Sequence, residues 1–110
     1  MTDIIKLEEE RLEWSLKTFP NATALSSLLK LKGEADEIIA DIEDNKREVE
    51  EYADCLMCLF DSAGRQNIPI TPEEIFEAFA KKLEINKNRT WVENPDHSYS
   101  HVKKLSNESN

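Results

Sequence analysis

Only two glycines and four prolines occur among the 110 residues of the chain. Glycine and proline are the strongest local breaks, so a chain with few of them has room for long helices and few tight turns. Between the breaks, apolar residues recur at helical spacing, and no alternating apolar pattern of useful length predicts strands. The sequence therefore predicts an all-α fold.

Four helices are expected between these breaks. The sharpest local signal is Thr71-Pro72-Glu73-Glu74, which offers Thr as the N-cap, Pro at the first helical position and Glu at the reciprocal capping-box position. Short connections make consecutive helices antiparallel neighbours, which predicts a four-helix bundle. We expect a single helical domain over residues 1–92 and a polar tail over 93–110. The expected helices cover about 3–17, 24–42, 46–66 and 72–88.

The chain is acidic, with 14 Lys and Arg against 23 Asp and Glu and a net charge of −9. An acidic surface disfavours nucleic acids and anionic membranes as partners, and it fits divalent cations as well as plain solubility. No apolar run is long enough to cross a membrane, and the N-terminal residues do not resemble a signal peptide. Cys55 and Cys58 lie in an apolar run without a second Cys/His pair, which predicts small core residues in a cytoplasmic protein.

Two pairs of acidic residues lie three positions apart on the second and third expected helices. They are Glu34 with Glu37, and Glu51 with Asp54. A spacing of three puts both members of a pair on one face of a helix, so the two pairs could face one another. Like charges at about 4 Å repel by on the order of 4 kcal/mol near a protein surface, and a bound Mg²⁺ or Mn²⁺ would offset that repulsion. Glutamates at this spacing also commonly face solvent, and the residues alone leave both interpretations open.

The residues around these pairs resemble a known superfamily. Residues 30–37 and 51–61 are similar to the MazG-like all-α nucleoside triphosphate pyrophosphohydrolases, which carry a Glu-x-x-Glu pair, a short spacer and a Glu-x-x-Asp pair. Three further stretches, at 13–19, 61–65 and 82–91, resemble the small bacterial and phage branch described as dATP/dGTP pyrophosphohydrolases. The resemblance implies a MazG-like fold and an enzyme that releases pyrophosphate and a nucleoside monophosphate, in which a metal-activated water attacks between the α- and β-phosphates. The catalytic metal ligands that it implies, for Mg²⁺ or Mn²⁺, are Glu34, Glu37, Glu51 and Asp54.

Further side chains near these motifs are candidates for contact with the nucleotide. Basic side chains bind phosphate oxygens, and aromatic rings stack on bases. Each also has an ordinary structural interpretation, such as charge at a helix end, packing, capping, or an i, i+4 ion pair between Asp61 and Arg65. The candidate substrate-binding residues are Lys30, Lys82, Asn86, Lys87, Arg89, Trp91, Trp14 and Asp61.

A core this small gains from a shared interface, so we expect a homodimer or a homotetramer, whose sites could draw on two chains. The expected ligand is a nucleoside triphosphate, with dATP and dGTP favoured by the resemblance. Two alternatives stay open. One is a pyrophosphohydrolase of the same superfamily for dUTP, dCTP or another nucleotide. The other is a non-catalytic helical interaction module, which needs the apolar stripes but no converging carboxylates.

Overall fold

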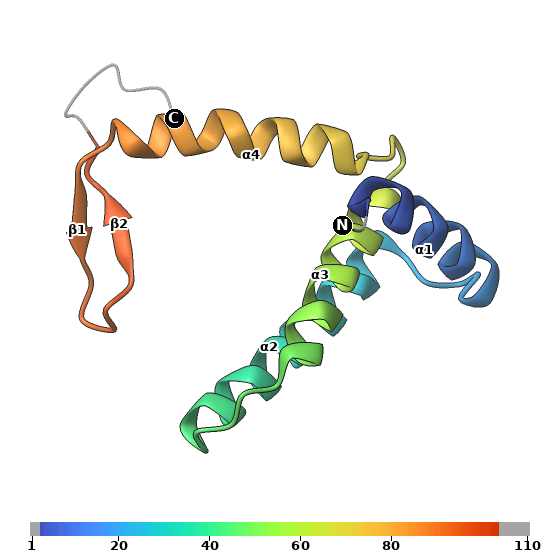
Figure 1. The fold of residues 1–110 in the computed structure, drawn as a ribbon, viewed down its shortest axis with the longest axis horizontal. Coiled ribbons are helices and arrows are strands. Elements are labelled where there is room, and N and C mark those ends of the chain that lie inside the picture. The colour runs from blue at the N-terminus through green and yellow to red at the C-terminus, as the bar shows by residue number, and fades with distance from the viewer. Residues whose placement is uncertain (1–2, 104–110) are drawn as a thin grey trace. The chain divides into compact units, whose positions relative to one another are not determined.

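The computed structural model describes residues 3–103, and in that range it contains four helices and one two-stranded sheet (Figure 1). The predicted all-α class with four helices is confirmed. The described residues fall into two units, one ending at Ile75 and the other beginning at Phe76. No helix between residues 3 and 103 is long and apolar enough to cross a membrane. The elements are α1 (Ile4–Thr18), α2 (Ala24–Glu43), α3 (Val49–Gly64), α4 (Pro72–Lys87), β1 (Trp91–Glu93) and β2 (Tyr99–His101).

Reciprocal capping fixes where α2 and α4 begin. At the start of α2, the Thr23 hydroxyl accepts the backbone N–H of Ser26 at 2.9 Å, and the Ser26 hydroxyl accepts the N–H of Thr23 at 2.8 Å. At the start of α4, Thr71 Oγ1 accepts the N–H of Glu74 at 3.2 Å, and Glu74 Oε2 accepts the N–H of Thr71 at 2.8 Å. Pro72 is the first residue of α4. The predicted capping box at α4 is therefore confirmed, and Thr23 is the cap of α2.

The third helix begins at Val49, later than the predicted start near residue 46. Asn45 adopts the left-handed backbone conformation with φ of 57°. The N–H of Lys46 donates to the carbonyl of Asp41 at 2.8 Å, so the chain closes a turn before α3 can start. Glu48, the N-cap residue, makes no side-chain capping bond, which explains why no sequence signal marks this helix start.

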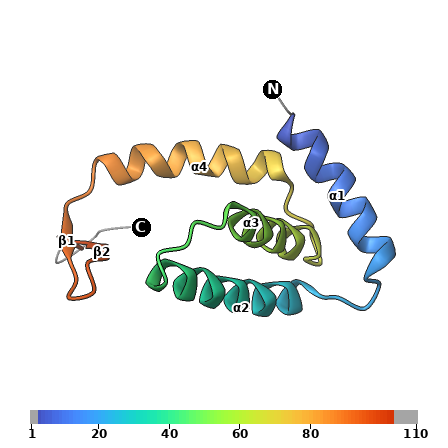
Figure 2. The same cartoon turned by 60° about the horizontal axis from the view of Figure 1, so that its bottom comes forward.

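Helices α2 and α3 form an antiparallel pair in the first unit (Figure 2). Ser62 near the end of α3 donates to the carbonyl of Ala24 at the start of α2, with an O–O distance of 2.8 Å. At the other end of the pair, Asp41 of α2 faces Glu51 of α3. This register turns one face of α2 towards one face of α3 along the length of both helices.

The buried interior of the described chain is small and unusually polar. Apolar residues recur at helical spacing in α2, where Leu28 is 41% and Ile42 is 61% exposed. Between them, the side chains are half-buried at Leu31, Ala35 and Ile38. The only buried apolar side chains among residues 3–103 are Cys58 and Phe60, whereas five polar or charged residues are buried: Glu8, Ser15, Ser27, Asp61 and Ser62. The first unit is therefore organised around a polar network, and many of its large apolar side chains are exposed.

The segment predicted to be a polar tail contains a β-hairpin. Strands β1 and β2 pair antiparallel, and the residues between them form a turn. The N–H of Asn94 donates to the carbonyl of Ser98 at 2.7 Å, His97 adopts a φ of 71°, and Asp96 Oδ1 accepts the N–H of Ser98 at 3.0 Å. The strands are three residues long and mostly exposed, so they leave no alternating apolar pattern from which they could be predicted.

Candidate functional site

The two acidic pairs lie on the facing sides of α2 and α3. Glu34 of α2 and Asp54 of α3 line the same cavity. The pKa of the Cys55 thiol is raised, and its largest cause is burial. The negative charges of four carboxylates from both helices raise it further: Glu34, Asp54, Glu51 and Glu37. This thiol belongs to α3, so the charges of the two α2 glutamates act across the helix pair.

Negative charge is crowded within α2. Repulsion from Glu34, together with a hydrogen bond between the two carboxyl groups, raises the pKa of Glu37. A hydrogen bond between two carboxyl groups needs a shared proton, because an ionised carboxylate only accepts. Lys30 offsets part of this charge, since its ammonium nitrogen lies 3.4 Å from Oε1 of Glu34.

A second crowded pair bridges the two helices. A hydrogen bond to Asp41, with burial and repulsion from the same residue, raises the pKa of Glu51 to about 7. With both groups ionised, Oδ2 of Asp41 and Oε2 of Glu51 are buried and have no hydrogen-bond partner among residues 3–103. Buried oxygens without partners are costly, so this pair would be stabilised by a proton or by a cation.

Asp41 was absent from the predicted set of site residues. It lies four positions after Glu37, which places it on the same helix face. This spacing is the sequence signal that could have added Asp41 to the predicted site. Its approach to Glu51 depends on the register of α2 against α3, which local spacing does not reveal.

The acidic side chains gathered from α2 and α3 offer donor atoms that suit a hard divalent cation. They are carboxylate oxygens, which Mg²⁺ and Mn²⁺ prefer, and two of them lack partners. Within residues 3–103, however, no three His, Cys, Asp or Glu side chains are close enough to form a complete metal site. A bound metal ion would therefore have to draw further carboxylates towards these pairs.

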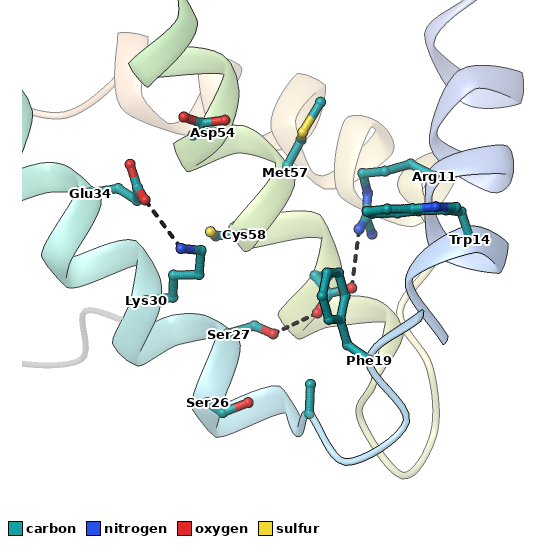
Figure 3. A pocket seen from close by; sticks show the side chains of 12 residues that line it. Arg11, Trp14, Phe19, Ser26, Ser27, Lys30, Glu34, Asp54, Met57 and Cys58 are labelled. Carbon is teal, nitrogen blue, oxygen red and sulfur yellow. Dashed lines mark hydrogen bonds and ion pairs between the residues drawn. The ribbon is translucent and has the colours of Figure 1, made fainter. Parts of the chain in front are cut away.

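A cavity of about 410 Å³ opens beside the acidic residues (Figure 3). Glu34 and Asp54 lie at one end of it. Trp14 and Phe19 lie at the other end, with ring centroids 5.4 Å apart in an edge-to-face arrangement. Lys30 lies between the two ends on α2. The cavity thus joins an aromatic wall to an acidic wall, with a cation between them.

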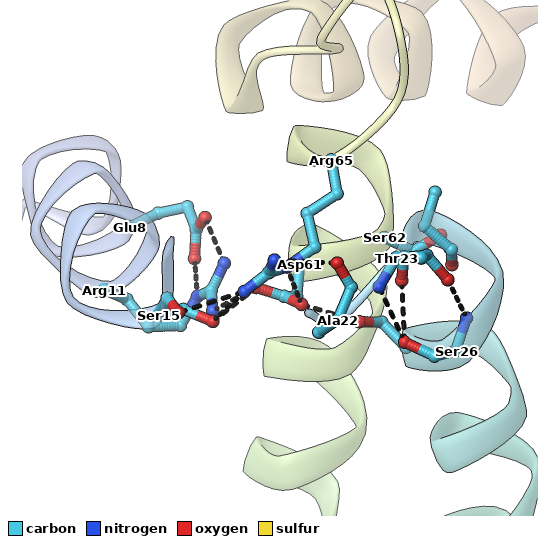
Figure 4. A network of polar contacts seen from close by, with 11 residues as sticks. Glu8, Arg11, Ser15, Ala22, Thr23, Ser26, Asp61, Ser62 and Arg65 are labelled. Carbon is cyan, nitrogen blue, oxygen red and sulfur yellow. Dashed lines mark hydrogen bonds and ion pairs between the residues drawn. The ribbon is translucent and has the colours of Figure 1, made fainter. Parts of the chain in front are cut away.

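Asp61, which lines this cavity, is the centre of a polar network that joins three helices (Figure 4). Oδ1 of Asp61 accepts from Ser15 at 2.8 Å and from Arg11 at 3.1 Å. Oδ2 accepts from Ser27 at 2.6 Å and from Arg65 at 2.8 Å. Burial alone would raise the pKa of Asp61, but these four bonds outweigh it and lower the pKa to about 2.

The arginines of this network are themselves held in place. Arg65 also donates to the carbonyls of Ala22 and Ser15, both at 3.0 Å, so it fixes the connection between α1 and α2. Arg11 is held by both carboxylate oxygens of Glu8 as well as by Asp61. The i, i+4 pair between Asp61 and Arg65, which was the structural interpretation of Asp61, is therefore present as part of a larger clamp.

The other predicted nucleotide contacts all belong to the second unit. In that unit, Lys87 pairs with a glutamate on its own helix at 3.4 Å, and Lys82 is exposed. The indole N–H of Trp91 donates to the carbonyl of Asn86 at 3.0 Å, and Arg89 donates to the Asn86 side chain at 3.4 Å. These contacts order the turn between α4 and β1.

Comparison with known proteins gives a consistent result. The family model described as dATP/dGTP pyrophosphohydrolase matches residues 7–108. A dATP/dGTP diphosphohydrolase of Salmonella phage PMBT28 is 33% identical over 89 residues, which cover 81% of this chain and 28% of that protein. The chain thus spans less than a third of the length of this relative. A solved structure described as a cyanophage S-2L MazG-like pyrophosphohydrolase bound to dGDP and three catalytic Mn²⁺ ions per active site is similar with a TM-score of 0.74. Its sequence is 25% identical, and the match covers 94% of this chain and 100% of that one.

Proposed function

The chain belongs to the dATP/dGTP pyrophosphohydrolase family, and from this premise we propose that it hydrolyses dATP and dGTP to the monophosphates and pyrophosphate. The main structural support is the gathering of acidic side chains from two helices beside a cavity of about 410 Å³. That volume lies in the usual range for small-molecule sites. The S-2L neighbour is described as binding dGDP and Mn²⁺, which supports the same class of ligand here.

In this proposal Glu34 and Glu37 of α2 and Glu51 and Asp54 of α3 hold Mg²⁺ or Mn²⁺. Their carboxylate oxygens are hard donors that suit both ions. When bound, the ions supply positive charge opposite the phosphates and promote ionisation of the attacking water. Asp41 adds negative charge next to Glu51, which strengthens the attraction of the site for a cation.

The nucleoside would occupy the aromatic end of the cavity. Trp14 and Phe19 are about half exposed and offer ring faces suited to stacking on a base. Lys30 lies between this end and Glu34, where the phosphates would join the nucleoside. In this arrangement the base would lie at the aromatic end of the cavity, and the phosphates would extend towards Glu34 and Asp54.

Asp61 was predicted to contact the substrate, and it does line the cavity. Its two oxygens already accept four hydrogen bonds. We therefore assign it a positioning role, in which it holds Arg11 and Ser27 in the cavity wall.

A triphosphate needs more positive charge than Lys30 and Arg11 provide. The family resemblance offers further contacts in Lys82, Asn86, Lys87, Arg89 and Trp91, which we assign to the phosphates and the base. We propose that the protein is a homodimer or a homotetramer, in which these contacts come from the same copy or from a neighbouring one. The exposed apolar faces of the helices support such an assembly. The cytoplasmic location expected from the two free cysteines stays a prediction.

The direct test offers dATP, dGTP, dCTP, TTP and dUTP separately with Mg²⁺, with Mn²⁺ and with EDTA, and measures pyrophosphate and orthophosphate. We expect pyrophosphate from dATP and dGTP, and none in EDTA. Release of orthophosphate alone would place the cleaved bond elsewhere and contradict the proposal.

The same assay separates the two alternative functions. A preference for dUTP or dCTP would assign the chain to another specificity within the superfamily. No turnover of any nucleotide, with no rise in melting temperature on adding Mg²⁺ or Mn²⁺, would favour a non-catalytic helical module, because an ion that binds the folded state must stabilise it.

A further inference from the structure

Two cations line the cavity among residues 3–103, and they differ in how firmly they are held. Arg11 is bound by Glu8 through two nitrogens and by Asp61 through the third, and its side chain is only 14% exposed. Lys30 is paired with Glu34 at 3.4 Å, and its side chain is 69% exposed. Arg11 is therefore a fixed part of the wall, whereas Lys30 is free to change partners at little cost.

Glu34, the partner of Lys30, is much less exposed to solvent than the lysine. The side chain of Glu34 is only 15% exposed, so it is poorly hydrated and depends on a nearby positive charge. Lys30 thus serves as the counter-ion of the acidic end when no metal ion is bound.

We propose that Lys30 exchanges partners during the catalytic cycle, from Glu34 in the metal-free protein to the α-phosphate of the nucleotide once a divalent cation has taken Glu34. This inference rests on the proposed function. A divalent cation competes for the same carboxylate with twice the charge of the ammonium, and it repels Lys30. The long stem of lysine lets the ammonium move without disturbing α2.

The position of Lys30 determines which phosphate it meets. It lies one helical turn from Glu34 towards the end of α2 where Ser26 and Ser27 line the cavity. That is the side on which Trp14 and Phe19 lie. The phosphate nearest to the nucleoside is the α-phosphate, which remains on the monophosphate product. Lys30 is therefore a positioning group for the phosphate that is attacked and retained.

The exchange predicts two effects of opposite sign for Lys30→Met, which removes the charge and keeps the length of the side chain. Titration calorimetry of the nucleotide-free protein with Mn²⁺ should show about two- to fivefold tighter binding, because the competing ammonium is gone. Titration of the Mn²⁺-saturated protein with dGMP should show about tenfold weaker binding, because a charge-assisted contact is lost. Binding of deoxyguanosine, which lacks the phosphate, should not change.

Lys32→Met is the matched control. It removes the same charge from an exposed position two residues further along α2 that does not line the cavity, so it should change neither affinity. Circular dichroism should show equal helicity in both variants, since both lysines are exposed.

Equal changes of affinity in Lys30→Met and Lys32→Met would mean that only the net charge matters, and would overturn the exchange. Weaker binding of Mn²⁺ by Lys30→Met would also overturn it, and so would unchanged binding of dGMP by this variant. Failure of the inference is distinguishable from failure of the proposed function. If the wild-type protein binds Mn²⁺ and releases pyrophosphate while Lys30→Met behaves like Lys32→Met, only the exchange is wrong. If the wild-type protein does neither, both proposals fall.

Discussion

At the scale of single residues, Asp61 shows how the fold tolerates a buried charge. Taking a carboxylate out of water is costly unless hydrogen bonds and opposite charges compensate. Asp61 is buried and accepts bonds from two serines and two arginines, so both of its oxygens are satisfied. Because the donors come from α1, α2 and α3, ionised Asp61 joins three helices.

This ionisation makes stability depend on pH. The pKa of Asp61 is about 2 in the folded protein against an ordinary value of 3.8. A lowered folded-state pKa adds stability that is complete above about pH 4 and is lost as the pH falls through about 2. The difference in free energy of unfolding between the wild-type protein and Asp61→Asn should therefore shrink by on the order of 2 kcal/mol between pH 6 and pH 2. Urea unfolding at stepped pH measures it.

Asp36→Asn is the control for this series. Asp36 is an exposed acid on α2, so its replacement should leave the pH dependence as it is in the wild-type protein. A constant difference between wild type and Asp61→Asn over the whole range would mean that the network does not favour the ionised form of Asp61.

Glu37 offers the test of the acidic site with the least risk to folding. It is exposed on α2 and crowded by Glu34, so Glu37→Gln removes one charge without removing a packing group. If it is a metal ligand, pyrophosphate release from dGTP should fall by about a hundredfold or more, with unchanged helicity by circular dichroism. Glu43→Gln, at the exposed end of the same helix, should keep full activity. Full activity in Glu37→Gln would remove Glu37 from the site.

The residue scale also shows what sequence could and could not predict. Spacing along one helix predicted that Glu34 lies next to Glu37, and it offered the Asp61–Arg65 pair as one interpretation. The other donors to Asp61 lie 34 to 50 positions away in the chain. Contacts at such separations depend on how helices pack, so local periodicity does not contain them.

At the scale of elements, prediction succeeded where a side chain satisfies the backbone locally. Thr71 caps α4 through Glu74, three positions further on, and this signal was read directly from the sequence. Prediction failed for the start of α3, where the N-cap residue makes no side-chain hydrogen bond, and for the hairpin of β1 and β2. These two features depend on backbone turns, of which the left-handed residues Asn45 and His97 are the main signs.

The packing of α1 against α3 can be tested with the two glycines of the chain. A Cβ added at Gly64 would lie 2.8 and 2.9 Å from the two methyl carbons of Leu12, whereas nothing lies within 4 Å of a Cβ added at Gly33. Gly33→Ala should raise the free energy of unfolding by about 0.5–1 kcal/mol, because alanine favours the middle of α2. Gly64→Ala should lower it by about 1 kcal/mol, because Leu12 must move. Urea unfolding at a fixed protein concentration measures both changes.

The two variants share the chemical change and differ in their surroundings. A gain in stability for Gly64→Ala equal to that of Gly33→Ala would mean that α1 does not press on the end of α3 as described. In that case the polar network, and not close packing, would be what fastens α1 to the rest of the first unit.

At the scale of the whole molecule, many large apolar side chains of the described residues are exposed, and contiguous exposed apolar surface is typical of an interaction site. Apolar residues recur at helical spacing along the sequence, yet within residues 3–103 only two apolar side chains are buried. Sequence identified the stripes correctly, but it could not tell whether they pack within one chain or between copies. Leu25, Leu28 and Leu29 form one such exposed group on α2.

If a second copy covers these stripes, stability must depend on protein concentration. A hundredfold excess of a partner over its dissociation constant adds about 2.7 kcal/mol, so the melting temperature should rise clearly between about 1 and 100 µM protein. Leu29→Glu should lower the melting temperature and shift the sedimentation coefficient towards the monomer. In a monomer the same change at an exposed position would cost less than about 0.5 kcal/mol. Gln66→Glu adds an equal charge at an exposed polar position and should change neither measurement. A melting temperature independent of concentration, with Leu29→Glu behaving like Gln66→Glu, would mean that the apolar face of α2 is not an interface.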